Sequence, residues 1–275
     1  MAQSGGQSLS GTRGPADGMD GLRERGFARY GAEQLGIAPA GSVAEDLAVI
    51  QEVCADLPPD PYAPGTQRFR RYSHAVYLPW TDALSWIPEV ADPVHGTVTE
   101  LSHGDHDAAS PRPRRVLPGL PEVLRTNPLL LRVLRWDIGQ VLSLKDLGRR
   151  PLWVGVHVIK LGVDHRGQVA VSSPDCLHQD GGSTGTFTFA HLISRKNVEG
   201  GQNLIATADS AGLRPEEIPT ADIHAHFTLS DPLEGYAVHD HRVSHYVGPV
   251  RAGSDPGPGE RSIVIVGIAP YVPQL

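Results

Sequence analysis

The chain has 275 residues, with 24 Lys and Arg against 31 Asp and Glu, which gives a formal net charge of −7 at pH 7. This charge argues against a nucleic-acid or anionic-membrane surface, and the length suits one large domain or two small ones. The two cysteines, Cys54 and Cys176, do not make a disulfide framework, so we expect a reducing, cytoplasmic setting. No stretch has the pattern of a transmembrane span or a signal peptide.

The N-terminal part predicts a tail and then a helical and loop segment. The first 20 residues carry almost no large apolar group, and we expect a disordered tail over residues 1–25. Two amphipathic helices are predicted, at residues 43–55 and 129–142. In both, apolar side chains recur near helical spacing behind a capping pattern, so both should cover a sheet.

From residue 152 onward the sequence consists of short β-rich runs separated by turns rich in Gly and Pro. The runs are residues 153–161, 184–193, 224–229, 236–239, 245–250 and 262–268, and an earlier one is 69–78. Several short strands at regular spacing predict a β sandwich or barrel. We therefore expect one domain over residues 26–275, with a helical and loop segment at 26–150 packed on a β core at about 151–270.

His178-Gln-Asp180 is the motif with the clearest chemical content. Residues two apart on an extended strand point to the same face, so an imidazole and a carboxylate would lie side by side. A histidine from a distant strand would complete two histidines and one carboxylate, the set that holds non-haem Fe(II) in oxygenases. The ordinary alternative is a histidine in a surface loop, since the chain has 13 histidines.

Several histidines could provide the third ligand. The candidates are His191, His224, His226, His239, His241 and His245. His224 and His226 form the main rival pair because they share one strand face, whereas His103 and His106 lie in a polar loop. Arg261 precedes a wholly apolar run, and burying its charge is costly without a partner anion. A dicarboxylic co-substrate would provide that anion, in a geometry that suits a guanidinium.

These features together resemble the 2-oxoglutarate/Fe(II)-dependent dioxygenases that hydroxylate free L-amino acids, the group that contains the L-isoleucine hydroxylases. The resemblance extends over roughly residues 68–268. It is carried by the blocks 69–72, 153–160, 174–181, 192–201, 240–245 and 260–261. It implies a mainly β fold, a double-stranded β-helix (a cupin-like jelly roll), with N-terminal helices packed on the sheet.

The resemblance also implies roles for particular residues. His178, Asp180 and His245 would bind Fe(II), and Arg261 would bind the 5-carboxylate of 2-oxoglutarate. Asp180 favours hydroxylation over halogenation, because related halogenases have a small residue there that leaves room for chloride. Ile263 stands where many 2-oxoglutarate oxygenases have a serine that makes a second contact to the same carboxylate.

Three more residues are candidates for contact with the substrate or with the residues behind the site: Arg195, His157 and Asn197. Arg195 follows the strand after the His-x-Asp motif, and a surface ion pair is its alternative role. His157 is polar within an apolar strand, where a hydrogen-bonded core histidine is more usual. Asn197 precedes Gly200-Gly201, and its alternative role is to form a turn.

The expected activity is hydroxylation of an unactivated C–H bond of a free L-amino acid, using Fe(II), 2-oxoglutarate and O2 and releasing succinate and CO2. One alternative is the same chemistry on a peptidyl or carrier-bound amino acid. Others are a non-oxidative cupin-like metalloprotein, such as an isomerase, and a β-sandwich binding module without catalysis. Arg261 argues against these last two, since neither needs an arginine that faces a dicarboxylate. The expected partner is a small-molecule amino acid, with no nucleic acid or membrane.

Overall fold

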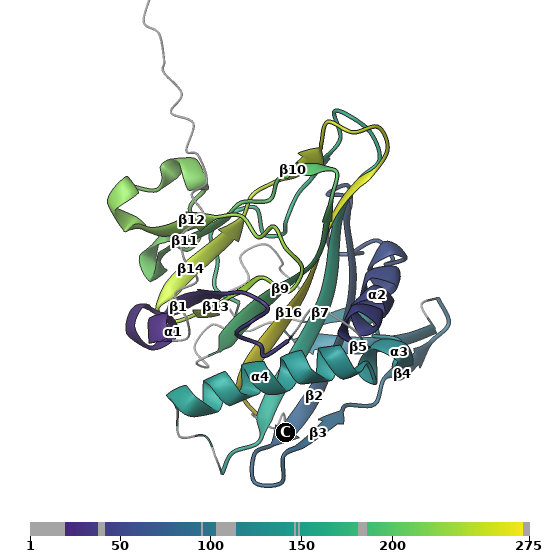
Figure 1. Cartoon of the computed structure of the whole chain (residues 1–275), viewed down its shortest axis with the longest axis vertical. Helices are drawn as coiled ribbons and strands as arrows, with labels where there is room; N and C mark the ends of the chain where they lie inside the picture. The colour runs from purple at the N-terminus through teal and green to yellow at the C-terminus, as the bar shows by residue number, and fades with distance from the viewer. Residues whose placement is uncertain are drawn as a thin grey trace, which may run out of the picture.

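Most of the fold is a layered arrangement of β-strands (Figure 1). The computed structural model describes residues 20–37, 42–94, 96–102, 114–145, 147, 149–180 and 186–271. Within this part of the chain the largest sheet has seven strands, all antiparallel to their neighbours. In spatial order they are β1 (Phe27–Tyr30), β13 (Gly235–His239), β9 (Phe187–Lys196), β16 (Gly259–Pro270), β7 (Leu152–Val163), β2 (Arg68–Leu78) and β3 (Ala83–Trp86).

Smaller sheets pack against one face of this main sheet. One has the order β12-β11-β14, the other β10-β15-β8. Their strands are β12 (Ile223–Phe227), β11 (Asn203–Thr207), β14 (Val243–Val247), β10 (Val198–Gly200), β15 (Val250–Ala252) and β8 (Val169–Ala170). Ile205 and Val243 of the first small sheet share an apolar cluster with Ile159 and Ile263 of the main sheet. The predicted β sandwich is therefore present.

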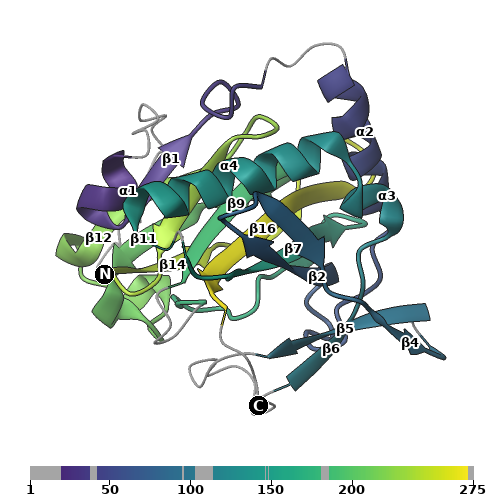
Figure 2. The same ribbon diagram turned by 90° about the horizontal axis from the view of Figure 1, so that it is seen from below.

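Helices cover the opposite face of the main sheet (Figure 2). These are α2 (Ser42–Ala55) and α4 (Pro128–Leu144), with the short helices α1 (Asp20–Arg25) and α3 (Glu122–Arg125) near them. The side chain of Asn127 caps α4 by accepting a hydrogen bond from the amide of Leu130 at 2.9 Å, which satisfies one free N–H of the first turn. The apolar stripe of α4 packs into the core that also contains Ile50 and Cys54 of α2.

The central strands β7 and β16 are buried on both faces, and alternate residues divide between the faces. In β7, Val154 and Val156 pack toward the helices, whereas His157 and Ile159 line a cavity on the other side. The partner strand β16 repeats the division, because Val264 joins the helix-side core. The same sheet thus has a purely structural face and a face that is available for chemistry.

The predicted elements are largely confirmed. Helices α2 and α4 match the helices expected at 43–55 and 129–142, and each predicted β run contains an observed strand. The run 245–250 is divided between β14 and β15, and residues 184 and 185 lie outside the described part of the chain. Of the tail expected over residues 1–25, residues 20–25 form helix α1, and residues 1–19 lie outside the described part.

An additional small sheet was not expected. It consists of β4 (Val90–Asp92), β5 (Gly96–Ser102) and β6 (Arg114–Pro118) and lies to one side of β2 (Figure 2). No helix in the described residues is long and apolar enough to cross a membrane.

A buried polar pair joins α4 to the main sheet. Nε2 of His191 on β9 lies 2.9 Å from the Asp137 carboxylate, and both side chains are at most 1% exposed. The hydroxyl of Tyr30 on β1 lies 3.3 Å from the same nitrogen. His191 therefore belongs to the helix-side core rather than to a metal site.

Asp137→Ala should lower the free energy of unfolding by about 3–5 kcal/mol, because it leaves a buried imidazole without its partner. Arg135→Ala on the same helix removes an exposed ion pair with Asp82 and should cost at most about 1 kcal/mol. Urea unfolding followed by circular dichroism measures both values. Equal losses in the two variants would contradict a stabilising role for the Asp137–His191 pair.

Candidate metal centre

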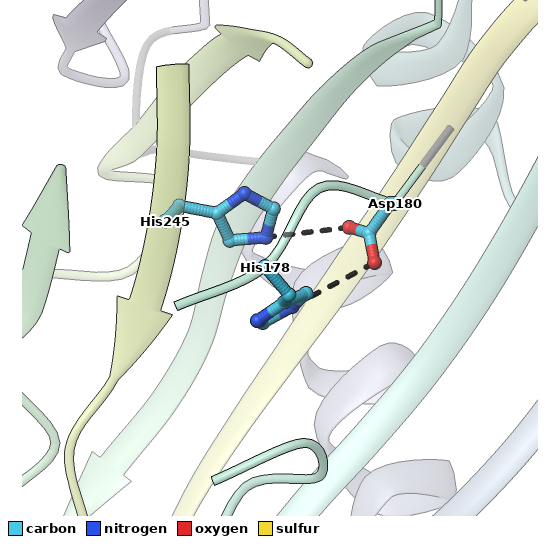
Figure 3. A group of neighbouring side chains, drawn as sticks. All are labelled: His178, Asp180 and His245. Carbon is cyan, nitrogen blue, oxygen red and sulfur yellow. Dashed lines mark ion pairs between the residues drawn. The ribbon is translucent and has the colours of Figure 1, made fainter. Parts of the chain in front are cut away.

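Two histidines and one aspartate converge at the inner face of the sandwich (Figure 3). Nε2 of His178 lies 3.7 Å from Oδ1 of Asp180, and Nε2 of His245 lies 3.3 Å from Oδ2. One ligand atom from each of the three residues lies within 4.8 Å of the others, and this is the metal-capable group found in the described residues. The structure thus brings together the three residues predicted as ligands.

A pair of backbone hydrogen bonds positions the two histidines. The amide of His178 donates to the carbonyl of His245, and the amide of His245 donates back, each at 2.9 Å. This isolated antiparallel bridge places the two imidazole centroids 4.3 Å apart. Asp180 follows two residues after His178, and its side chain, which is 40% exposed, turns back toward both rings.

Hydrogen bonding fixes which nitrogen of His178 is free to bind a metal. Nδ1 of His178 lies 3.0 Å from the carbonyl oxygen of Cys176. A carbonyl oxygen can only accept, so Nδ1 carries the proton and Nε2 carries the lone pair. That lone pair points toward Asp180, as a metal ligand in this position requires.

Electrostatics gives His178 and Asp180 the protonation states that metal binding needs. Burial, and then the charge of His245, lowers the pKa of His178 to about 4, so its imidazole is neutral at pH 7. Removal from water alone would raise the pKa of Asp180. The hydrogen bond and charge of His245 outweigh it and hold that pKa well below its usual range. For His245, burial alone would lower the pKa, but the hydrogen bond and charge of Asp180 outweigh it and raise that pKa, so a metal would displace a proton from this ring. A neutral imidazole and an ionised carboxylate are the ligand forms that bind metals.

A buried carboxylate lies behind His245. Oδ1 of Asp240 is 4.0 Å from Nδ1 of His245, and neither atom has a hydrogen-bond partner in the described residues. Thr188 donates to the other oxygen of Asp240 at 3.1 Å. Burial, and then the negative charge of Asp180, raises the pKa of Asp240. A carboxylate here can orient the His245 ring once that ring binds a cation.

The metal-capable group opens into a cavity of about 350 Å³. Arg261 on β16 lines this cavity and is 2% exposed. Its Nε and Nη2 have no hydrogen-bond partner in the described residues, and burial lowers its pKa to about 10. A buried guanidinium with free donors is costly, so the site matches an anionic ligand. Tyr236 and Ile263 line the same cavity.

The remaining predicted site residues have different surroundings. His157 lines the cavity, and its Nδ1 lies 2.7 Å from Nη2 of Arg70. Arg195 pairs in register with Arg261, but its guanidinium donates to the carbonyls of Val198 and Gly200. It is absent from the described lining of the cavity.

Asn197 forms a turn outside the cavity. It has a left-handed φ of 46°, and its side chain donates to the carbonyls of Asp255 and Gly257. These contacts hold the long connection that precedes β16.

The rival histidine pair has a different environment. His224 on β12 is exposed and stacks on Phe27 at 6.1 Å, and neither it nor His226 belongs to a metal-capable group of the described residues. His103 and His106 lie outside the described part of the chain.

Three arginines of the cavity wall were not singled out from the sequence. They are Arg68, Arg70 and Arg115. A signal was available for Arg70, which lies in the predicted run 69–78, and Arg68 directly precedes that run, so that an extended chain would place both on one face. Arg115 comes from the unexpected strand β6 and had no such signal.

The residues of the site fit the ligands that the resemblance implies. Two imidazole nitrogens and a carboxylate oxygen are the donors of the open three-ligand sites that hold non-haem Fe(II). The orphaned Nε and Nη2 atoms of Arg261 fit a carboxylate of a co-substrate.

Comparison with known proteins gives a consistent result. The sequence model of the family described as 2OG-Fe dioxygenase matches residues 51–267. A relative, the 3(1)-hydroxy-L-isoleucine 4-dioxygenase of Pantoea ananatis (strain AJ13355), is 25% identical over 220 residues. The match covers 75% of this chain and 74% of that protein.

Solved structures of similar fold extend over nearly the whole chain. A bsmA homolog from Methylobium petroleophilum PM1 has a TM-score of 0.70 at 18% identity and covers 94% of this chain and 93% of that chain. IDO from Bacillus thuringiensis has a TM-score of 0.66 at 18% identity, with 92% and 97% covered. These likenesses confirm the predicted jelly-roll fold.

Gly201 packs closely against the side chain of Arg261. It has a φ of +68°, and a β-carbon there would lie 3.0 Å from Cδ of Arg261 and 3.3 Å from Nη1 of Arg195. Gly201→Ala should therefore displace the guanidinium and raise the dissociation constant for 2-oxoglutarate by about 10- to 100-fold. Titration of the co-substrate under anaerobic conditions with Fe(II) measures this change.

Gly65 provides a matched control, because its φ is +77° and nothing lies within 4 Å of the added β-carbon. Alanine at either position should cost about 1–2 kcal/mol of stability through the left-handed backbone, but Gly65→Ala should leave co-substrate affinity unchanged. Equal affinities in the two variants would show that Gly201 does not set the place of Arg261.

Proposed function

This chain belongs to the 2OG-Fe dioxygenase family, and from that membership we propose that it hydroxylates an unactivated C–H bond of a free L-amino acid. As a member it is an enzyme that uses Fe(II), 2-oxoglutarate and O2. The observation that most supports the proposal is the convergence of His178, Asp180 and His245 in a cavity that also contains the buried Arg261. The activity named for the Pantoea ananatis relative, on a hydroxylated isoleucine, supports an amino-acid substrate.

In this proposal His178, Asp180 and His245 hold Fe(II) on one face and leave the other face open to the cavity. The bound metal and its co-substrates supply the oxidising chemistry that attacks a C–H bond. The protein contributes the fixed ligands, and the bridge between His178 and His245 limits their movement. Asp180 occupies the third ligand position with a carboxylate, which favours hydroxylation over halogenation.

Arg261 binds the 5-carboxylate of 2-oxoglutarate in this proposal. Its guanidinium offers two free donors in a buried place, where a bidentate pair with a carboxylate is strong. Ile263 cannot supply the hydroxyl that many such enzymes place two residues later. The buried Tyr236 lines the same cavity, and burial raises the pKa of its phenol, which keeps it protonated as a donor. Its phenol is therefore the candidate for the second contact.

Apolar side chains form much of the remaining wall of the cavity. Ile159 and Ile265 of the main sheet line the cavity, together with Leu101 of β5 and the indole of Trp153. Such walls exclude water and hold an aliphatic group near the metal without competing for it. A non-oxidative metalloprotein or a binding module without catalysis does not fit this family.

The first test is the binding of metal and co-substrate. Anaerobic addition of Fe(II) and 2-oxoglutarate to the wild type should produce a weak visible metal-to-ligand charge-transfer band, and His178→Ala should abolish it because one imidazole ligand is lost. His224→Ala, which removes an exposed histidine on β12, should retain the band. Absence of the band in the wild type would refute the assignment of His178, Asp180 and His245 as ligands.

The second test concerns Arg261. Arg261→Ala should raise the 2-oxoglutarate concentration needed for half-maximal succinate release by about 10- to 100-fold, the loss expected for one hydrogen-bonded charge pair. Arg195→Ala, on the neighbouring strand with its guanidinium bound to backbone carbonyls, should have a smaller effect. An unchanged requirement in Arg261→Ala would remove this residue from the co-substrate site.

The substrate itself can be identified with a panel of free L-amino acids. Succinate release stimulated by an amino acid, together with a product 16 Da heavier for the one added oxygen, would establish hydroxylation. Stimulation by carrier-bound or peptidyl amino acids in place of the free acids would contradict the proposed substrate class.

A further inference from the structure

We propose that the cavity contains a second anion subsite, formed by Arg70 with Arg68 and Arg115 beside it, which binds the carboxylate of the substrate. This inference rests on the proposed function and makes it more specific. It predicts that the substrate carries a free carboxylate. It therefore argues against a carrier-bound or peptidyl amino acid, because in those forms the carboxylate is part of a covalent bond.

Arg70 is the centre of the proposed subsite. It lies on β2, lines the cavity and is 3% exposed. Its Nη2 donates to Nδ1 of His157 at 2.7 Å, while its Nε is buried and has no hydrogen-bond partner in the described residues. A guanidinium has five N–H donors, so Arg70 retains donor capacity at a place where unsatisfied donors are costly. A carboxylate in the cavity would satisfy that capacity.

A buried aspartate orients Arg70 from outside the cavity lining. Oδ2 of Asp60 lies 3.4 Å from Nη1 of Arg68 and 3.6 Å from Nη1 of Arg70, and Oδ1 of Asp60 accepts from the amide of Tyr62 at 2.9 Å. Asp60 is not part of the cavity lining. It therefore restrains the two guanidinium groups. Arg68 also donates to the carbonyl of Ser173 at 3.2 Å, so the donor capacity that remains for a ligand is that of Arg70.

The charges around Arg70 also favour an anion. Burial, and then the positive charge of Arg68, lowers the pKa of Arg70 to about 9, and Arg115 adds to this effect. Like charges held close together in a dry place destabilise one another. A carboxylate bound among them would relieve that repulsion, and its planar shape matches the guanidinium fork.

The proposed subsite is separate from Arg261. Arg70 on β2 is in register with Ile159 of β7, and Ile159 is in register with Ile263 of β16, two residues beyond Arg261. Strands are about 4.8 Å apart, so the backbones of Arg70 and Arg261 are at least about 10 Å apart. The two guanidinium groups therefore come from different strands of the cavity wall, and the proposal assigns the co-substrate carboxylate to Arg261 and the substrate carboxylate to Arg70.

His157 connects the subsite to the metal centre. Because Arg70 can only donate, Nδ1 of His157 must accept, and a neutral ring then carries its proton on Nε2. His157 also stacks on Tyr72 with centroids 4.4 Å apart. His157 lines the same cavity as His178 and Asp180, so a ligand held at Arg70 shares that cavity with the metal-capable group.

The test compares free acids with carboxamides. The proteinogenic L-amino acids and their primary carboxamides are titrated anaerobically into protein that is saturated with Fe(II) and 2-oxoglutarate, and binding is followed by calorimetry. At least one free acid should bind the wild type more tightly than its carboxamide. Arg70→Met should weaken that free acid by about 10- to 100-fold and remove its advantage over the carboxamide, while Arg70→Lys should recover part of it.

Arg71→Lys provides the matched control. Arg71 lies on the opposite face of β2 and donates to the carbonyl of Gly119 at 2.7 Å, so its replacement should keep the wild-type preference. The charge-transfer band with 2-oxoglutarate should be unchanged in Arg70→Met, which shows that the variant is folded and that Arg261 still binds the co-substrate.

The outcomes separate the two proposals. A band absent from the wild type would overturn the proposed function. If the band is normal but no free acid binds the wild type better than its carboxamide, only the second subsite is overturned. The same conclusion follows if Arg70→Met keeps the preference for the free acid.

Discussion

The pair of backbone hydrogen bonds between His178 and His245 is the interaction on which the site depends. His178 precedes β9, and His245 lies on β14 of the β12-β11-β14 sheet. The two residues are far apart in the sequence, so the chain between them does not fix their separation. The bridge makes them a directly opposed antiparallel pair, in which side chains lie on the same face. Asp180 then reaches both rings because it lies two residues after His178. A slip of one residue in this pairing would turn one imidazole away from the others.

The two faces of the main sheet have different roles. One face packs in the apolar core, and the other carries the polar groups of the cavity. Its helix side contains the largest apolar core and the Asp137–His191 pair, where each polar atom has a partner within hydrogen-bond distance. Its cavity side contains Arg70 and Arg261, whose donors are incompletely satisfied. Unpaired polar groups on the helix side would lower the stability of the fold, because no ligand could reach them to supply a hydrogen-bond partner. In the proposed function, anions bound on the cavity side would supply the missing hydrogen-bond partners of these arginines and offset that cost.

Sequence alone predicts the parts of this architecture that are encoded locally. The β-rich runs at 153–161 and 262–268 and the cap of α4 at Asn127 are local patterns, and both are present as β7, β16 and the observed cap. The choice of His245 over five other histidines required the family resemblance, because it depends on a pairing between distant strands. Position also decides the role of arginines: Arg195 is in register with Arg261 but turns to backbone carbonyls. Asp60 could not be recognised, since only the fold places it behind Arg68 and Arg70.

The positions of the buried arginines restrict how ligands can be arranged in the cavity. Arg261 and Arg70 lie on strands that flank β7 on opposite sides, and the apolar side chain of Ile159 lies between them in the cavity wall. A carboxylate that leaves one guanidinium must cross this apolar surface to reach the other, at a desolvation cost. In the proposed arrangement, co-substrate and substrate would therefore bind at separate arginines. A substrate anchored at Arg70 would place its carbon chain in a cavity lined by apolar side chains and by the metal-capable group. The carbon that reacts is then set by the length of chain between the anchored carboxylate and that centre.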